Sequence, residues 1–173
     1  MKLFGMAAQV FFSVLLLVGA GCELGPGGPS SGSDKGPDPL SVYASYSAAK
    51  VDIMPLTDFV GAGSGGEAGR IRVYVGLLDS FNSQIKSPGV FRFELYEHVQ
   101  RSPEPAGKRL VVWPDIDLTD PAGNNNYWRD YLRAYEFSLD FEPQNSRSYL
   151  LQVTCLCPNG KRLSDAFVLK YGK

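Results

Sequence analysis

The chain has 173 residues, of which 44% are hydrophobic and 20% are charged, and its 17 basic residues against 18 acidic ones leave a net charge of -1. Once a leader and a linker are set aside, about 135 residues remain, which is enough for one globular domain and too few for two. The composition therefore excludes a multidomain enzyme. The charge balance offers no basic excess that would attract nucleic acid.

The first residues have the pattern of a signal segment. Lys2 is followed by an uncharged stretch, Leu3 to Gly21, that is most apolar between Val10 and Val18. This is the order of a basic n-region and an apolar h-region. The stretch ends in Val18-Gly19-Ala20-Gly21-Cys22, and small residues placed directly before a cysteine resemble the lipobox of bacterial lipoproteins.

The resemblance implies that residues 1–21 are a lipoprotein signal peptide and that Cys22 becomes the lipidated first residue, carrying palmitate-type acyl chains. Three such chains would anchor the protein permanently, since each buried methylene contributes about 0.8 kcal/mol. In this family a residue such as Glu23 after the cysteine favours transport to the outer membrane, facing the periplasm or the exterior. The length of the uncharged stretch leaves two alternatives open, an uncleaved transmembrane anchor and an ordinary secretory signal.

Residues 22–39 are predicted to be a flexible tether. Five glycines, four prolines and three serines make up 12 of the 17 residues from Glu23 to Pro39, a composition that cannot bury apolar surface. A coil of this length has a root-mean-square reach of about 20 to 25 Å. We therefore expect the domain at residues 40–173 to float near its membrane without lying on it.

That domain has the alternating pattern of half-buried strands. Apolar residues occupy every second position in the strongest segments, which are Arg70 to Leu78, Phe91 to Tyr96 and Tyr135 to Phe141. Weaker runs at Lys50 to Leu56 and Arg109 to Trp113, and a C-terminal pair, bring the count to about seven strands. A turn of helix is possible only between Tyr127 and Arg133. Seven short strands predict an all-β fold, a two-sheet antiparallel sandwich.

The C-terminal pair is predicted to be a hairpin with a three-residue loop, Pro158-Asn159-Gly160, in which Gly160 takes the left-handed conformation. This register aligns one apolar face, with Asp165 as the exception. The loop also keeps Pro158 out of the ladder of hydrogen bonds. The predicted partners are Leu151 with Phe167, Tyr149 with Leu169 and Cys155 with Leu163.

The strand pattern, length and terminal hairpin together resemble the immunoglobulin-like and transthyretin-like sandwiches common in bacterial surface lipoproteins. A second similarity is to the small outer-membrane lipoprotein of type VI secretion, through Arg72-Val73-Tyr74 and the following short loop that contains Phe81. These resemblances imply a binding or assembly module of the cell envelope.

Aromatic residues at the end of a sandwich are candidates for partner contact. Tyr127, Trp128 and Tyr131 follow a polar connection rich in glycine and asparagine, and such side chains stack sugars or hold protein partners. The alternative is that Trp128 closes the end of the core. In the same connection, Asp115, Asp117 and Asp120 form a weak candidate for calcium, although the spacing differs from that of an EF-hand.

Other candidate chemistry is less specific. Gly61, Gly63 and Gly66 satisfy a dinucleotide-binding spacing, but a strand follows where that fingerprint requires a helix. Cys155 and Cys157 lie on one face of a strand, where they are either small core residues, a strained disulfide or intermolecular bond, or metal ligands. The single histidine, His98, is predicted to be solvated.

We therefore expect a membrane-tethered, non-catalytic domain that has no cofactor and no metal and binds an unidentified protein or carbohydrate partner. One alternative is a small envelope hydrolase or carbohydrate-active enzyme, whose mark would be paired carboxylates among Glu94, Glu97 and Asp130. Another is an accessory lipoprotein of a secretion apparatus.

Overall fold

The computed structural model describes residues 43–44, 46–61, 69–144 and 147–172. In this part of the chain the elements are β1 (Lys50–Ile53), β2 (Asp58–Val60), β3 (Arg70–Leu78), β4 (Gln84–Ile85), β5 (Val90–His98), β6 (Ala106–Val112), β7 (Ile116–Asp117), α2 (Pro121–Tyr127), β8 (Trp128–Arg129), β9 (Ala134–Asp140), β10 (Arg147–Leu156) and β11 (Arg162–Tyr171).

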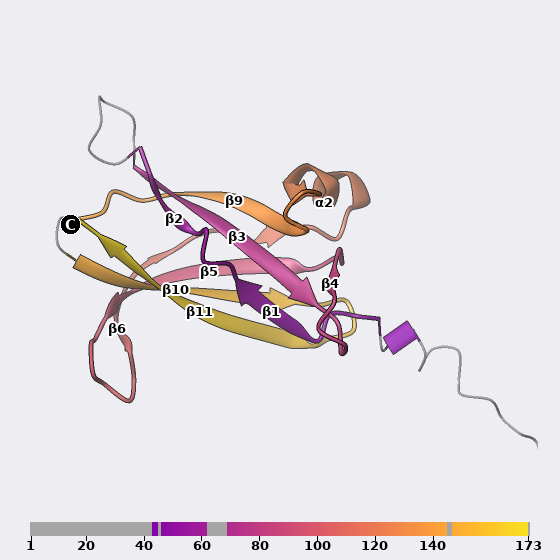
Figure 1. Ribbon diagram of the computed structural model, residues 1–173, viewed down its shortest axis with the longest axis horizontal. Helices are drawn as coiled ribbons and strands as arrows, with labels where there is room; N and C mark the ends of the chain where they lie inside the picture. The colour runs from indigo at the N-terminus through magenta and orange to yellow at the C-terminus, as the bar shows by residue number, and fades with distance from the viewer. Residues whose placement is uncertain (1–42, 45, 62–68, 145–146, 173) are drawn as a thin grey trace, which may run out of the picture. The chain divides into compact units, whose positions relative to one another are not determined.

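The strands form two antiparallel sheets, which confirms the predicted all-β sandwich (Figure 1). One sheet has six strands in the order β1-β3-β9-β8, with β2 and β4 also paired to β3. The other has five strands in the order β11-β10-β5-β6, with β7 paired to β5. The seven strands of four residues or more correspond to the seven predicted ones. The remaining strands have two or three residues, too few to show an alternating pattern.

The hydrophobic core lies between the two sheets. Alternate residues of β3, β5 and β9 are buried, as their sequence pattern predicts. In β10, Leu150 and Thr154 on the other face are buried as well. Three fully buried rings occupy the centre. The ring centroid of Phe137 lies 5.2 Å from that of Phe91 and 4.8 Å from that of Phe93. These rings join the six-stranded sheet to the five-stranded one.

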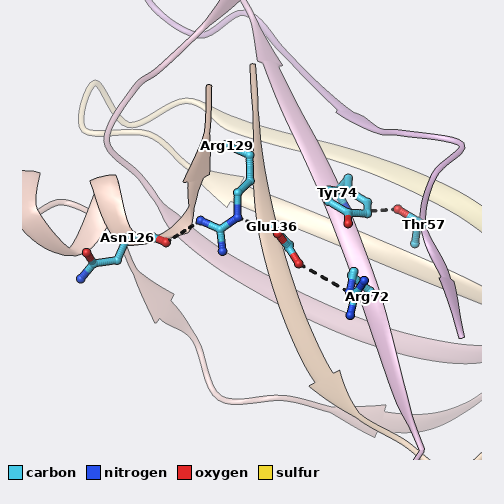
Figure 2. Close-up of polar contacts among 6 residues, drawn as sticks. All are labelled: Thr57, Arg72, Tyr74, Asn126, Arg129 and Glu136. Atoms are coloured by element: carbon cyan, nitrogen blue, oxygen red, sulfur yellow. Dashed lines mark hydrogen bonds and ion pairs between the residues drawn. The ribbon is translucent and has the colours of Figure 1, made fainter. Parts of the chain in front are cut away.

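β1 and β2 pair with opposite halves of β3. Between them, a threonine side chain accepts a hydrogen bond from the middle of β3. Thr57 is buried, and its Oγ1 accepts a hydrogen bond from the backbone N of Tyr74 at 3.0 Å, as Figure 2 shows. The carbonyl of Tyr74 accepts from the N–H of Met54 at 2.8 Å. The backbone N–H and carbonyl of Tyr74, which lie between the parts of β3 paired with β1 and β2, are therefore both hydrogen-bonded.

The C-terminal hairpin has the predicted register, with Leu151 opposite Phe167 and Cys155 opposite Leu163. Gly160 has a φ of 79°, the left-handed conformation that the loop was expected to need. Asp165, the polar exception on the inner face, has a specific role. Its Oδ2 accepts a hydrogen bond from the backbone N of Ile53 at 2.7 Å, so the carboxylate pairs β1 with β11 where the two sheets meet.

Gly89, the residue before β5, packs closely against β10, and this contact leads to a stability prediction. A Cβ added at Gly89 would lie 2.8 Å from the buried Sγ of Cys155. We therefore expect Gly89→Ala to lower the free energy of unfolding by about 1 to 3 kcal/mol through overpacking. Denaturant unfolding would measure this. In a chain that already carries Cys155→Ala, the Sγ atom is absent, so adding Gly89→Ala should lower the free energy of unfolding by less than it does in the wild-type chain. Equal losses in the two backgrounds would contradict the contact.

The helix lies earlier in the chain than the sequence analysis placed it. It spans Pro121–Tyr127, whereas the expected turn of helix at 127–133 is replaced by β8 and a tight turn. The reason is the N-terminal cap. The Oδ2 of Asp120 accepts from the N–H of Gly123 at 2.8 Å, and Pro121 occupies the first helical position, where its missing N–H is not needed.

Candidate functional site

A buried polar network fixes the end of the sandwich that carries α2. The hydroxyl of Tyr135 accepts from the N–H of Ser87 at 2.9 Å and lies 2.8 Å from the Ser87 carbonyl and 3.1 Å from Oδ1 of Asn124. The Nδ2 of Asn124 donates to the carbonyl of Leu118 at 2.9 Å. Burial raises the pKa of Tyr135, so its hydroxyl remains a donor.

These hydrogen bonds shape an open groove on the surface, which we call the α2 groove. One wall is the segment 86–88, and the other is Thr119 with the first turns of α2. Because Ser87 and Asn124 are both held by the network, the two walls are fixed relative to each other. The groove is therefore formed in advance of any ligand, which reduces the cost of ordering on binding.

A cation and an indole lie beside the α2 groove. The Nζ of Lys86 lies 5.8 Å from the centroid of the Trp128 ring and donates to Oδ1 of Asn125 at 2.5 Å. Trp128 is half-buried, with its ring edge-on to Tyr135 at 5.1 Å and its Nε1 donating to Asp130 at 2.7 Å. Part of the indole therefore supports the core, while part stays available to solvent.

The structure does not bring the three predicted aromatic residues together as one platform. Tyr127 is half-buried and packs against Phe137, with ring centroids 5.2 Å apart. Tyr131 is 78% exposed in the turn between β8 and β9. Trp128 thus combines the two interpretations that the sequence left open, since it both closes the core and contributes to the surface.

Charged side chains tie α2 to the outer face of the six-stranded sheet. Figure 2 shows Arg129, Glu136 and Arg72 on the adjacent strands β8, β9 and β3. Glu136 accepts from Nε of Arg129 at 2.6 Å and lies 3.5 Å from Nε of Arg72. Nη1 of Arg129 donates to the carbonyl of Asn126 at 2.8 Å. This cluster holds the last turn of α2 and has no free carboxylate for acid or base chemistry.

The structure does not bring the three aspartates of the calcium candidate together: in the described part of the chain, no group of three or more acidic, histidine or cysteine side chains could hold a metal ion. Asp115 makes a two-point ion pair with Arg92, at 2.8 and 2.7 Å, and this hydrogen bonding lowers the pKa of Asp115. Asp117 accepts from the hydroxyl and N–H of Thr119, which lowers its pKa as well. Asp120 caps α2. Each carboxylate therefore has a separate structural role.

The carboxylates considered for glycoside hydrolysis also have individual partners. Glu94 pairs with Arg109 at 3.1 Å, on neighbouring strands. Glu97 pairs with Arg147 at 3.3 Å. Asp130 accepts from the Trp128 indole and lies in the turn that follows β8, in the other sheet.

The two cysteines and the histidine are not among the residues that line the α2 groove. Cys155 and Cys157 are buried free thiols, and burial raises the pKa of both, so the reactive thiolate form is suppressed. His98 is half-buried, not fully solvated as predicted. Its Nδ1 is buried and has no hydrogen-bond partner in the described part of the chain.

Sequence reasoning did not identify Lys86, Ser87 or Asn124 as parts of a site. Ser87 and Asn124 act mainly through backbone partners and are 37 residues apart in sequence. The one available signal was the Asp120-Pro121 pair, which predicts a helix start and would have placed Asn124 on a helix.

Comparison with protein families, curated proteins and solved structures finds no match to this chain. Cys22, Gly63 and Gly66 lie outside the described residues. Among the residues that are described, there is no helix with the length and hydropathy needed to cross a bilayer.

Proposed function

We propose that this chain is a non-catalytic lipoprotein, anchored through Cys22, that serves as a binding or assembly module at the cell envelope. The observation that carries the binding role is the α2 groove, whose walls are fixed by buried hydrogen bonds while Lys86 and Trp128 lie beside it. Preformed loops on a rigid sandwich are where binding residues concentrate. The lipobox-like segment and Glu23 support attachment to the outer membrane.

The partner class follows from the chemistry of the groove. An indole under a lysine ammonium offers an apolar surface with a positively charged edge, which suits the face of a sugar or an aromatic or acidic side chain of a protein. A carbohydrate or protein partner is therefore proposed, reached through the aqueous space beside the membrane. The domain needs no cofactor for this role.

Capture from membranes tests the groove. We expect Trp128→Ala to reduce partner binding by about 30-fold or more, as loss of an aromatic hot spot of about 2 kcal/mol would do. The control is Trp113→Ala, the same change at the other tryptophan, which also packs against the core and whose Nε1 donates to the carbonyl of Asp140. The affinity of each variant for the recovered partner is then measured. If the two variants bound it equally well, the α2 groove would not be the binding site.

Intact-mass analysis tests the anchor. We expect a mature chain that begins at Cys22 and carries diacylglyceryl and amide-linked acyl mass, because small residues precede this cysteine at the end of the apolar stretch. Cys22→Ser should release or mislocalise the protein. A chain that begins upstream of Cys22, or at Cys22 without acyl mass, would disprove lipid anchoring.

A further inference from the structure

Three exposed aromatic residues lie where the chain joins the sandwich. Lys50 opens β1 opposite Leu78, at the end of β3. In the preceding segment, the N–H of Tyr46 donates to the carbonyl of Tyr43 at 3.1 Å, which closes a turn. The Tyr46 ring lies 6.2 Å from that of Phe81, in the connection between β3 and β4. We call Tyr43, Tyr46 and Phe81 the aromatic patch.

The aromatic patch is largely uncovered. The exposed fractions are 73% for Tyr43, 63% for Tyr46 and 67% for Phe81. Single exposed apolar residues are normal on a protein surface, whereas neighbouring exposed rings such as Tyr46 and Phe81 indicate an interaction site. Phe81 is the most informative of the three because its ring has no polar group that would favour exposure to water.

The connection that carries Phe81 is held rigidly. Asp79 is buried, and its Oδ1 accepts hydrogen bonds from the N–H groups of Phe81 at 2.8 Å and Ser83 at 2.9 Å. The N–H of Asn82 donates to the Asp79 carbonyl at 3.1 Å, and Asn82 has a φ of 62°. The turn therefore holds Phe81 at its tip, and little backbone entropy is lost when the ring is covered.

We infer that the aromatic patch rests on the lipid surface to which the chain is anchored, an inference that depends on the proposed lipidation of Cys22. Twenty residues separate Cys22 from Tyr43, and a coil of that length reaches about 25 Å. The anchor therefore holds this end of the domain at a high effective concentration next to the bilayer. Even weak affinity of the patch for lipid then produces contact.

The chemistry of the patch and its surroundings fits a membrane interface. Tyrosine places its ring among the acyl chains and its hydroxyl among the headgroups, and phenylalanine adds apolar area. An exposed cation lies close by, Arg133, whose Nη2 donates to the carbonyl of Gln84 in β4 at 2.7 Å. A basic residue near an anionic membrane surface is attracted by the negative headgroups. The domain therefore keeps one preferred side toward the lipid and does not float freely beside the membrane.

The test uses the full-length, lipidated protein in vesicles of phosphatidylethanolamine and phosphatidylglycerol. An environment-sensitive dye is attached in one preparation to Ser83→Cys, two residues from Phe81, and in a second to Gln100→Cys, in the connection between β5 and β6. In Figure 1 this connection lies at the other end of the sandwich from β4. The native thiols Cys155 and Cys157 are buried and resist labelling. We expect a blue shift and increased emission at position 83 in vesicles, and emission typical of water at position 100.

The variant Tyr46→Ser/Phe81→Ser should abolish the blue shift at position 83 while the protein stays in the vesicle fraction. A water-like signal at position 83 in protein with confirmed acyl mass would overturn the inference, as would equal shifts at both positions or a shift that the double variant retains. Absence of acyl mass would instead disprove the proposed anchor, so the two failures are distinguishable. Melting curves of the double variant check that the domain remains folded.

Discussion

Replacing Phe137 by alanine should lower the free energy of unfolding by about 3 to 5 kcal/mol, because a buried aromatic ring is lost and a cavity remains. Phe137 is fully buried, and its ring lies within 5.2 Å of the ring centroids of Phe91, Phe93 and Tyr127. It therefore joins the two sheets and supports the residue that ends α2. Equilibrium denaturation in urea would measure the loss.

The matched control is Phe81→Ala, the same chemical change at a ring that is 67% exposed. We expect it to alter stability by no more than about 0.5 kcal/mol, as surface substitutions usually do. If the two variants unfolded at similar denaturant concentrations, the assignment of Phe137 to the centre of the core would be wrong. A stable Phe81→Ala variant would also show that the aromatic patch is not needed for folding.

Replacing Asn124 by alanine should lower the free energy of unfolding by about 1 to 3 kcal/mol, since buried polar groups lose their partners. The Leu118 carbonyl would lose its donor, and the hydroxyl of Tyr135 would lose one acceptor. We also expect faster hydrogen exchange at the N–H of Ser87, because the opposite wall of the α2 groove is no longer held. Denaturation and exchange measured by mass spectrometry would test both effects.

The control for this prediction is the neighbouring Asn125→Ala. Both residues lie in α2, so replacement by alanine increases helix propensity equally at the two positions. Asn125, however, is exposed, and among the described contacts its Oδ1 accepts only from the exposed Lys86. Equal destabilisation by the two variants would rule out the buried network as the source of the loss. A double variant with Tyr135→Phe should show non-additive energies, because both residues belong to one network.

Much of the fold could be predicted because the longer strands alternate so strictly. In Arg70–Leu78 the predicted and observed bounds coincide, since one face packs on the core and the other faces solvent. The register of the last hairpin was predictable for a different reason, because Pro158 cannot donate to the ladder and Gly160 accepts the left-handed turn. The short strands have only two or three residues each, which is too few for an alternating pattern to reveal them.

The candidate site was predictable only in part. Its aromatic residues were evident, but which rings turn inward is decided by contacts across the sandwich, such as that between Tyr127 and Phe137. The three aspartates are close together in sequence, but each has its own partner: Arg92 for Asp115, Thr119 for Asp117 and the N–H of Gly123 for Asp120. The partner of Asp115 is distant in sequence, so the local pattern does not reveal it. The network that shapes the groove relies on carbonyls of Ser87 and Leu118, and backbone acceptors leave no signature in sequence.

The contact of Asp165 with β1 also fixes the direction of the last strand. Asp165 accepts a hydrogen bond from Ile53 at the end of β1. Six residues later in β11, the Tyr171 ring packs against that of Phe59 in β2, with centroids 5.4 Å apart. The two segments therefore run side by side in the same direction, and the ten residues of β11 carry the C-terminus about 30 Å away from the end at which β1 begins. A fluorescent protein or affinity tag attached after the last strand would thus sit clear of both the aromatic patch and the α2 groove, which makes the C-terminus the better attachment point for imaging or purification.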